Sequence, residues 1–208
     1  MQIYVPTPPV SPAAVPAQVA EASSAGKPKI ETEIEVEQVF GAGQQPFTIL
    51  AASISREFNR FGADAVQLAV DGFAGGEFPY LAFRIEGCRS KAQERLTARV
   101  CAGLGAYHDF SAGGTSPIIG VSGAVDFWHG RVSNYVSFER AFTAPTFTYY
   151  HGESAVVLVN AKRWQVATGI ISRSIQPVGA KVTLQINQVQ VYGTAGKGAN
   201  SFGLMFNF

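Results

Sequence analysis

IIGVSGAVDFWHGRVSNYVSFERAF, residues 118–142, is the stretch that decides the fold class. Apolar side chains occupy alternate positions on both sides of a short polar link, His129-Gly130. Two alternating runs joined in this way are typical of a β-hairpin, because a tight turn requires a positive φ that glycine adopts easily. The stretch therefore predicts a hairpin with one apolar face, formed by Ile119, Val121, Val125, Phe127, Val132, Val136, Phe138 and Phe142.

The second face of this hairpin consists of small and weakly polar residues, which are Gly120, Ser122, Ala124, Ser133, Tyr135 and Ser137. Only 15% of the 208 residues are charged, whereas an average globular chain has roughly 25%. If the apolar face packs in a core, the second face is too weakly polar for a free surface. We therefore expect it to be covered by other protein or by lipid.

The same alternation recurs along most of the chain from residue 30 to residue 208. About eleven candidate strands with turns every 10–15 residues predict one all-β domain, a jelly-roll-like antiparallel β-sandwich or barrel. Two places depart from simple alternation. The capping-box pattern Ser90-x-x-Gln93 predicts a helix of about two turns, and a phase slip near Asn187-Gln188 predicts a β-bulge.

Residues 1–29 differ from the rest because they are rich in proline and alanine and carry almost no charge before Glu21. Proline fixes φ and removes a hydrogen-bond donor, so this segment is expected to be an extended arm that contacts a neighbouring subunit. Its first ten residues lack the basic and apolar regions of a secretory signal. We therefore expect a chain that stays where it is made, unless a signal has been removed.

A run of four alternating glutamates marks the first expected strand, at residues 30–40. The apolar residues Ile34 and Val36 would face the core, and Glu33, Glu35 and Glu37 would form an acidic outer face. Because like charges at this spacing repel one another, we expect basic partners across the strand or on another subunit. A metal site is the weaker alternative, since calcium loops interleave glycine and asparagine with their ligands.

Two motifs approach catalytic or ligand-binding patterns without matching them. The loop from Gly193 to Gly198 is too short for a phosphate-binding loop and precedes a strand instead of a helix, which indicates a hairpin loop. The sequence around Ser122 resembles a nucleophile elbow, but Ala124 replaces its final glycine and a strand follows. Lys162-Arg163-Trp164 could bind single-stranded nucleic acid, but we interpret it as a strand-end anchor.

Histidine and cysteine offer little further chemistry. His108, His129 and His151 lie far apart in sequence, and each is interpreted as a strand-end or turn residue, although serine-histidine catalysis is recognised only by geometry. Cys88 and Cys101 fit no metal-binding spacing, and we expect a reduced buried pair. No catalytic, cofactor-binding or metal-binding residue is therefore assigned.

The C-terminal sequence SFGLMFNF, residues 201–208, carries the one family resemblance. A polar residue at Ser201, Gly203, an apolar Phe206 and a terminal Phe208 follow the pattern of the assembly signal of bacterial outer-membrane β-barrels. The resemblance implies a membrane barrel of alternating strands. It covers eight residues, and neither a signal peptide nor long polar loops accompany it.

These observations predict a non-enzymatic structural subunit of a virion, located in a capsid or other phage particle and acting through subunit contacts. Its expected partners are copies of itself or other subunits, contacted by residues 1–29. Nucleic acid is not expected, because the net charge is only +1, and a cofactor is not expected either. Apolar runs are too short for a transmembrane helix. The alternative is a bacterial outer-membrane β-barrel, the one case in which a membrane would be the partner.

Overall fold

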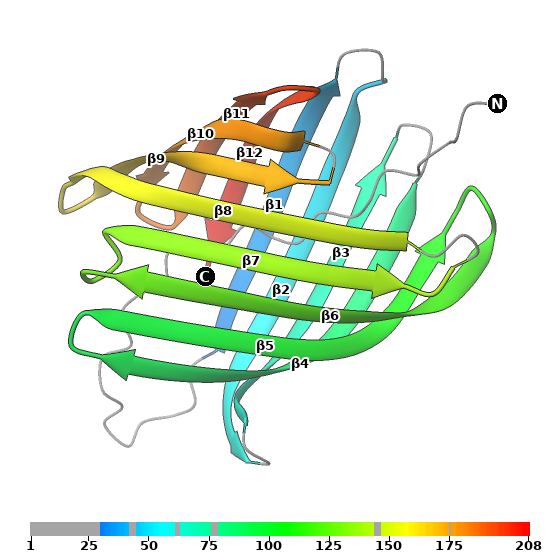
Figure 1. Cartoon of the computed structure of the whole chain (residues 1–208), viewed down its shortest axis with the longest axis horizontal. Helices are drawn as coiled ribbons and strands as arrows, with labels where there is room; N and C mark the ends of the chain where they lie inside the picture. The colour runs from blue at the N-terminus through cyan, green and yellow to red at the C-terminus, as the bar shows by residue number, and fades with distance from the viewer. Residues whose placement is uncertain (1–29, 42–44, 61–62, 76–78, 144–146, 175) are drawn as a thin grey trace.

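The computed structural model of the protein describes residues 30–41, 45–60, 63–75, 79–143, 147–174 and 176–208. Twelve antiparallel strands form one closed barrel in this part of the chain (Figure 1). Strands β4 to β9 form the wall nearest the viewer in Figure 1, and β1 to β3 lie behind them. Among the described residues, no helix has the length and apolar character needed to cross a membrane.

The strands follow the chain in simple succession, and each pairs with its sequence neighbours. The barrel closes where β1 pairs with β12. The all-β antiparallel prediction is confirmed, but an up-and-down order replaces the expected jelly-roll order. The strands are β1 Ile30–Gly41, β2 Phe47–Arg60, β3 Ala63–Ala74, β4 Tyr80–Gln93, β5 Leu96–Asp109, β6 Gly114–Phe127, β7 Val132–Ala141, β8 Phe147–Asn160, β9 Trp164–Arg173, β10 Gln176–Ile186, β11 Val189–Gly196 and β12 Ala199–Asn207.

The hairpin predicted at residues 118–142 is confirmed as β6 and β7. Its link is longer than the predicted pair, since positive φ angles occur at Trp128 (50°), His129 (59°) and Gly130 (78°). The predicted helix at Ser90 is wrong, because Ser90 pairs with Arg99 in the β4–β5 ladder. The predicted bulge is also wrong. Asn187, at φ 53°, begins the two-residue turn between β10 and β11, and this turn reverses the chain.

The expected orientation of the hairpin faces is inverted. Ile119 and Val121 are 47% and 53% exposed, and they point away from the barrel. The weakly polar face points inward, with Ser137 only 2% exposed. This second face is covered as predicted, but by the interior of the same barrel. The expected packing of the apolar face in a core is wrong.

The two ends of the barrel are distinguished by the connections that they carry. At the first end β1 begins and β12 finishes, so we name it the termini end; its connections are 61–62, 94–95, 128–131, 161–163 and 187–188. The opposite end carries connections 42–46, 75–79, 110–113, 142–146, 174–175 and 197–198. The longest connections therefore lie at the opposite end.

Gly105 on β5 marks a close approach of two strands. A Cβ atom at this position would lie 1.8 Å from the carbonyl oxygen of Phe83 on β4. We expect Gly105→Ala to destabilise the folded barrel by about 1–3 kcal/mol, because the backbone of β4 must shift to relieve the overlap. Urea unfolding measures the effect. Gly114→Ala is the matched control, since nothing lies within 4 Å of its Cβ position, and equal unfolding midpoints for the two variants would contradict the prediction.

Candidate functional site in the barrel interior

The glutamates of β1 point into the barrel. Glu35 and Glu37 are 1% and 0% exposed, whereas Ile34 and Val36, which alternate with them, are 42% and 38% exposed. The acidic outer face predicted from the sequence is therefore wrong. Alternation separates two sets of side chains, but it does not say which set points inward. Carboxylates inside a barrel need cations or hydrogen-bond donors, because an isolated buried charge is costly.

Arg84 on β4 is the centre of the first ion cluster. Its guanidinium lies 2.8 Å from Asp71, 2.9 Å from Glu139 and 3.0 Å from Glu86. Arg84 is 1% exposed, so bulk water does not screen these contacts. The cluster connects the inner faces of β3, β4 and β7. Since β3 and β7 are not neighbours in the wall, it links strands that share no backbone ladder.

Arg173 on β9 makes the second cluster with β1. Its Nη1 donates to both carboxylate oxygens of Glu37, at 2.8 and 2.9 Å. The hydroxyl of Tyr192 on β11 donates to Glu35. The sequence predicted basic partners across the strand or on another subunit; Arg173 is such a basic partner, but it lies on β9, which does not pair with β1. The two partners are 136 positions apart, so closure of the barrel is what brings them together.

Lys181 and Glu153 extend the same band of charges along β10 and β8. The Lys181 Nζ donates to Glu153 at 2.8 Å and lies 4.4 Å from the centroid of the Tyr192 ring. His151 lies on the inner face beside them, with its Nε2 3.8 Å from the Glu153 carboxylate. Because Tyr192 also bonds Glu35, these residues and the β1 glutamates form one connected band.

Aromatic and aliphatic side chains fill the interior at the opposite end. The ring centroids of Phe47 and Phe73 are 4.9 Å apart, those of Phe73 and Tyr80 are 4.6 Å apart, and those of Tyr80 and Tyr107 are 5.1 Å apart. Buried aliphatic residues and Tyr149 continue this cluster around the wall. The interior therefore has an aromatic and aliphatic cluster at this end, in addition to the ionic residues.

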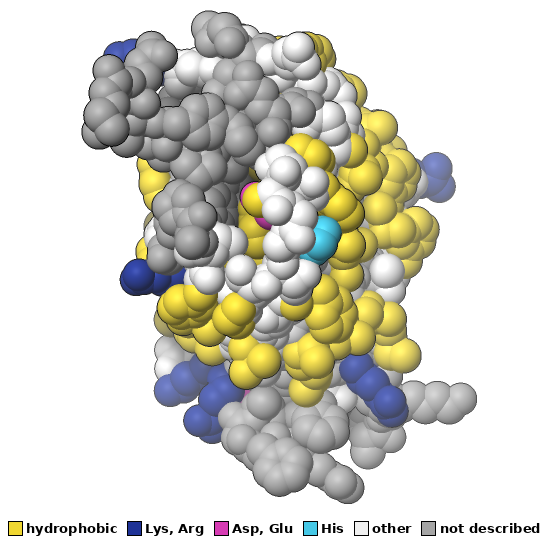
Figure 2. Space-filling view, turned by 90° about the vertical axis from the view of Figure 1, so that its right-hand side faces the viewer, with side chains coloured by type: hydrophobic (Ala, Val, Ile, Leu, Met, Phe, Trp, Pro, Cys, Tyr) yellow, Lys and Arg dark blue, Asp and Glu magenta, His cyan; other side chains and the backbone are white. Residues whose placement is uncertain are grey.

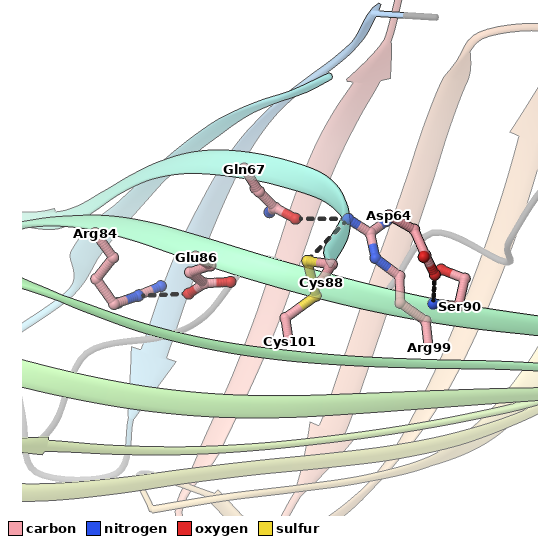
Figure 3. The surroundings of a disulfide bond; sticks show 8 residues. All are labelled: Asp64, Gln67, Arg84, Glu86, Cys88, Ser90, Arg99 and Cys101. Carbon is pink, nitrogen blue, oxygen red and sulfur yellow. Dashed lines mark hydrogen bonds and ion pairs between the residues drawn. A yellow bond between two sulfur atoms is a disulfide. The ribbon is translucent and has the colours of Figure 1, made fainter. Parts of the chain in front are cut away.

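A disulfide joins Cys88 on β4 to Cys101 on β5, directly across the ladder (Figure 3). The prediction of a reduced pair is therefore wrong. Both residues face the interior, with exposures of 0% and 5%. The Arg99 Nη2 donates to the Cys88 sulfur at 3.3 Å and to the Gln67 amide oxygen at 3.0 Å, and Figure 3 shows these groups beside the bond.

The residues that could have carried catalysis are not brought together. His108 bonds Thr115 near the end of β5, His129 lies in the β6–β7 turn, and His151 lies inside the barrel. Ser122 is part of β6, where it pairs with Ser137, so it is not in a nucleophile elbow. The region of the suspected phosphate loop is mostly strand, because β11 continues to Gly196.

Metal binding also finds no support within the described ranges, where no group of three or more histidine, cysteine or acidic side chains could hold an ion. The interior carboxylates lie instead against Arg84, Arg173 and Lys181. Such ion pairs can hold distant strands together in a polar interior. The ion pairs thus connect distant strands of the wall, and the aromatic cluster fills one end of the interior.

No protein-family model and no curated protein matches the sequence. Among solved structures, the chain is similar to a loop-deletion mutant of OmpT, an outer membrane protein of Vibrio cholerae, at 9% identity and a TM-score of 0.37. That match covers 89% of this chain and 100% of the other. A mutant of the Rh. blastica porin matches at 7% identity and a TM-score of 0.28, covering 87% and 100% of the two chains.

The virion subunit predicted from the sequence is wrong, and with it the virion location. That prediction needed a jelly-roll whose uncharged outer faces are buried between subunits. The chain instead forms a closed up-and-down barrel that turns its ionic residues inward and its apolar residues outward. The predicted arm, residues 1–29, lies outside the described residues.

Proposed function

We propose that this protein is an integral β-barrel of a bacterial outer membrane. The observation that carries the proposal is the inverted polarity of the wall. Val100, Leu104 and Ile170 are 61%, 69% and 63% exposed on the outside, while Arg84 and Arg173 are 1% exposed on the inside. Figure 2 shows hydrophobic side chains covering much of the described surface. An apolar surface of this extent matches a lipid environment better than water.

The height of the apolar surface fits a bilayer. On β6 the outward apolar positions run from Ile119 to Phe127. Nine residues at about 3.3 Å each, tilted by about 40°, span roughly 23 Å. The apolar band of transmembrane barrels is about 25 Å tall. The closed wall also satisfies the backbone hydrogen bonds, which a bilayer core requires.

Exposed aromatic residues lie at both margins of this band. Trp128 in the β6–β7 turn and Trp164 at the start of β9 are 57% and 44% exposed at the termini end. Phe142 and Tyr150 are 48% and 43% exposed near the opposite end. The amphipathic rings of tryptophan and tyrosine prefer the level of the lipid headgroups, between the apolar core and water.

The C-terminal strand supports the proposal through its packing. Phe202 on β12 and Phe208 directly after it are exposed, and β12 closes the barrel against β1. Gly203 faces inward, where a Cβ atom would lie 2.2 Å from the ring of Tyr192. The glycine of the assembly-signal pattern is therefore the position that admits this buried tyrosine. Any side chain at position 203 would clash with Tyr192, so the packing of β12 requires the glycine in the pattern of residues 201–208.

The disulfide adds support, because such bonds persist in oxidising compartments such as the bacterial periplasm. We further propose that the barrel acts without catalysis, as a wall whose interior is occupied by ion pairs and aromatic rings. This part of the proposal rests on the separation of the histidines described above. The expected contact between copies through residues 1–29 stays a prediction.

The proposal predicts that the purified protein needs detergent and migrates on a gel according to its fold. Unheated barrel should run at a different position from boiled, unfolded chain, because a closed barrel held by its ladders resists the detergent of the gel. Samples run with and without reductant separate this effect from that of the disulfide. A protein that stays soluble without detergent, with one gel position at all temperatures, would show that it is not a membrane barrel.

A further inference from the structure

Exposed basic side chains are concentrated at the termini end. The set consists of Arg56, Arg89, Lys91, Arg95, Arg131, Lys162 and Arg163, and we name it the basic collar. The opposite end has two exposed cations among the described residues, Arg140 and Lys197. Figure 2 shows several Lys and Arg side chains gathered at the lower margin of the hydrophobic surface. The collar thus gives one end of the barrel a positive rim.

Among the described residues, the cations of the collar outnumber the exposed carboxylates at the same end. Exposed carboxylates at the same end are Glu31, Glu57 and Glu94, which are fewer than the collar cations. The ion pairs described above lie in the barrel interior, where they involve Arg84, Arg173, Lys181 and His151. The collar therefore keeps its charge available for an external anion.

Two collar segments lie next to the tryptophans. Arg131 follows Trp128 in one turn, and its backbone N–H donates to the Trp128 carbonyl at 3.4 Å. Lys162 and Arg163 directly precede Trp164. If the tryptophans lie at the headgroup level, these cations lie in the layer of lipid phosphates, because long basic side chains extend from the apolar surface toward the charged layer.

From this geometry we propose that the basic collar binds the headgroups of anionic phospholipids in the leaflet that surrounds the termini end. The inference rests on the proposed membrane function. Basic residues beside a membrane attract anionic lipid, and the attraction weakens with salt. Since outer-membrane barrels carry their short turns on the periplasmic side, this leaflet is the phospholipid layer that faces the periplasm.

The two tryptophans are internal probes for this proposal, because the chain has only these two and both lie at the termini end. The purified full chain is reconstituted in vesicles of phosphatidylcholine and phosphatidylglycerol, and one lipid or the other carries bromine, which quenches tryptophan fluorescence. We expect stronger quenching by brominated phosphatidylglycerol, with an enrichment of roughly fivefold for each cation that contacts a headgroup. High salt should reduce this preference.

The variant Lys162→Gln/Arg163→Gln should lower the preference for phosphatidylglycerol by up to about 25-fold, as two contacts of roughly fivefold each are lost. The matched control, Arg140→Gln/Lys197→Gln, removes the same charge at the opposite end and should leave the preference unchanged. Equal quenching by the two brominated lipids, or an equal loss in both variants, would overturn the collar as a lipid site. If neither lipid quenches, the protein is not in the bilayer, and the proposed function fails instead.

Discussion

Replacing Arg84 by methionine is expected to destabilise the folded barrel by about 3–5 kcal/mol, because it leaves buried carboxylates without their cation. Three carboxylates, from Asp71, Glu86 and Glu139, lie within 3.0 Å of this guanidinium. Methionine preserves most of the apolar volume, so the loss reports on charge more than on packing. Unfolding by urea in detergent micelles, followed by tryptophan fluorescence, gives the change in free energy.

Two further variants make this result specific. Arg140→Met removes an exposed arginine from the outer wall and should change stability by less than about 0.5 kcal/mol. Adding Glu139→Gln to Arg84→Met should recover part of the loss, since one uncompensated charge is removed and the two sites are coupled. If Arg84→Met unfolds like the parent protein, the ion cluster does not hold the wall together.

Placing an arginine on the outer wall at Val121 is expected to cost about 1–3 kcal/mol in a lipid bilayer, because the charge would lie inside the apolar band, between its midplane and its margin. Val121 is 53% exposed and lies within the apolar band of β6. The same substitution on a water-exposed surface would change stability by only about 0.5 kcal/mol. The free energy of folding into vesicles therefore distinguishes a lipid-facing wall from a wet one.

Ala195→Arg is the matched control for this measurement. Ala195 is exposed on β11, one residue from the end of that strand, so its charge would lie near the membrane surface and cost about 0–1 kcal/mol. Equal and small effects at Val121 and Ala195 would mean that the outer wall is not in contact with lipid.

Local structure could be predicted from the sequence to a large extent. Alternation located β6 and β7, and the link at His129-Gly130 marked their turn, because these signals depend only on neighbouring residues. The two wrong predictions of local structure also came from short sequence patterns. Ser90 has a capping-box pattern, but pairing with β5 overrode it, and the phase slip at Asn187 was a chain reversal instead of a bulge.

The orientation of the two faces could not be read from alternation alone, because a period of two is the same for a water-soluble and a lipid-facing wall. A signal for the second case was present on β4. Phe83 and Ile85 alternate there with Arg84 and Glu86, so residues of opposite charge share one face and bulky apolar residues share the other. Opposite charges on the same face indicate mutual pairing within an enclosed interior.

The interior contacts themselves depend on closure of the barrel. The glutamate run that includes Glu37 predicted a basic partner. That partner, Arg173, lies on β9, far from Glu37 in the sequence and in the order of strands around the wall. The two residues meet only because the closed barrel brings the inner faces of β1 and β9 together, and no local sequence pattern predicts this contact. The aromatic cluster at the opposite end is likewise assembled from strands throughout the chain.

The position of the disulfide determines when it can form. Cys88 and Cys101 belong to one hairpin, so they can meet as soon as β4 and β5 pair. Once the wall is complete, both sulfurs lie inside it at 0% and 5% exposure, where an oxidising enzyme has no access. We therefore expect oxidation to precede closure. If the barrel lies in the outer membrane as proposed, the bond would form in the periplasm, before the chain becomes a barrel.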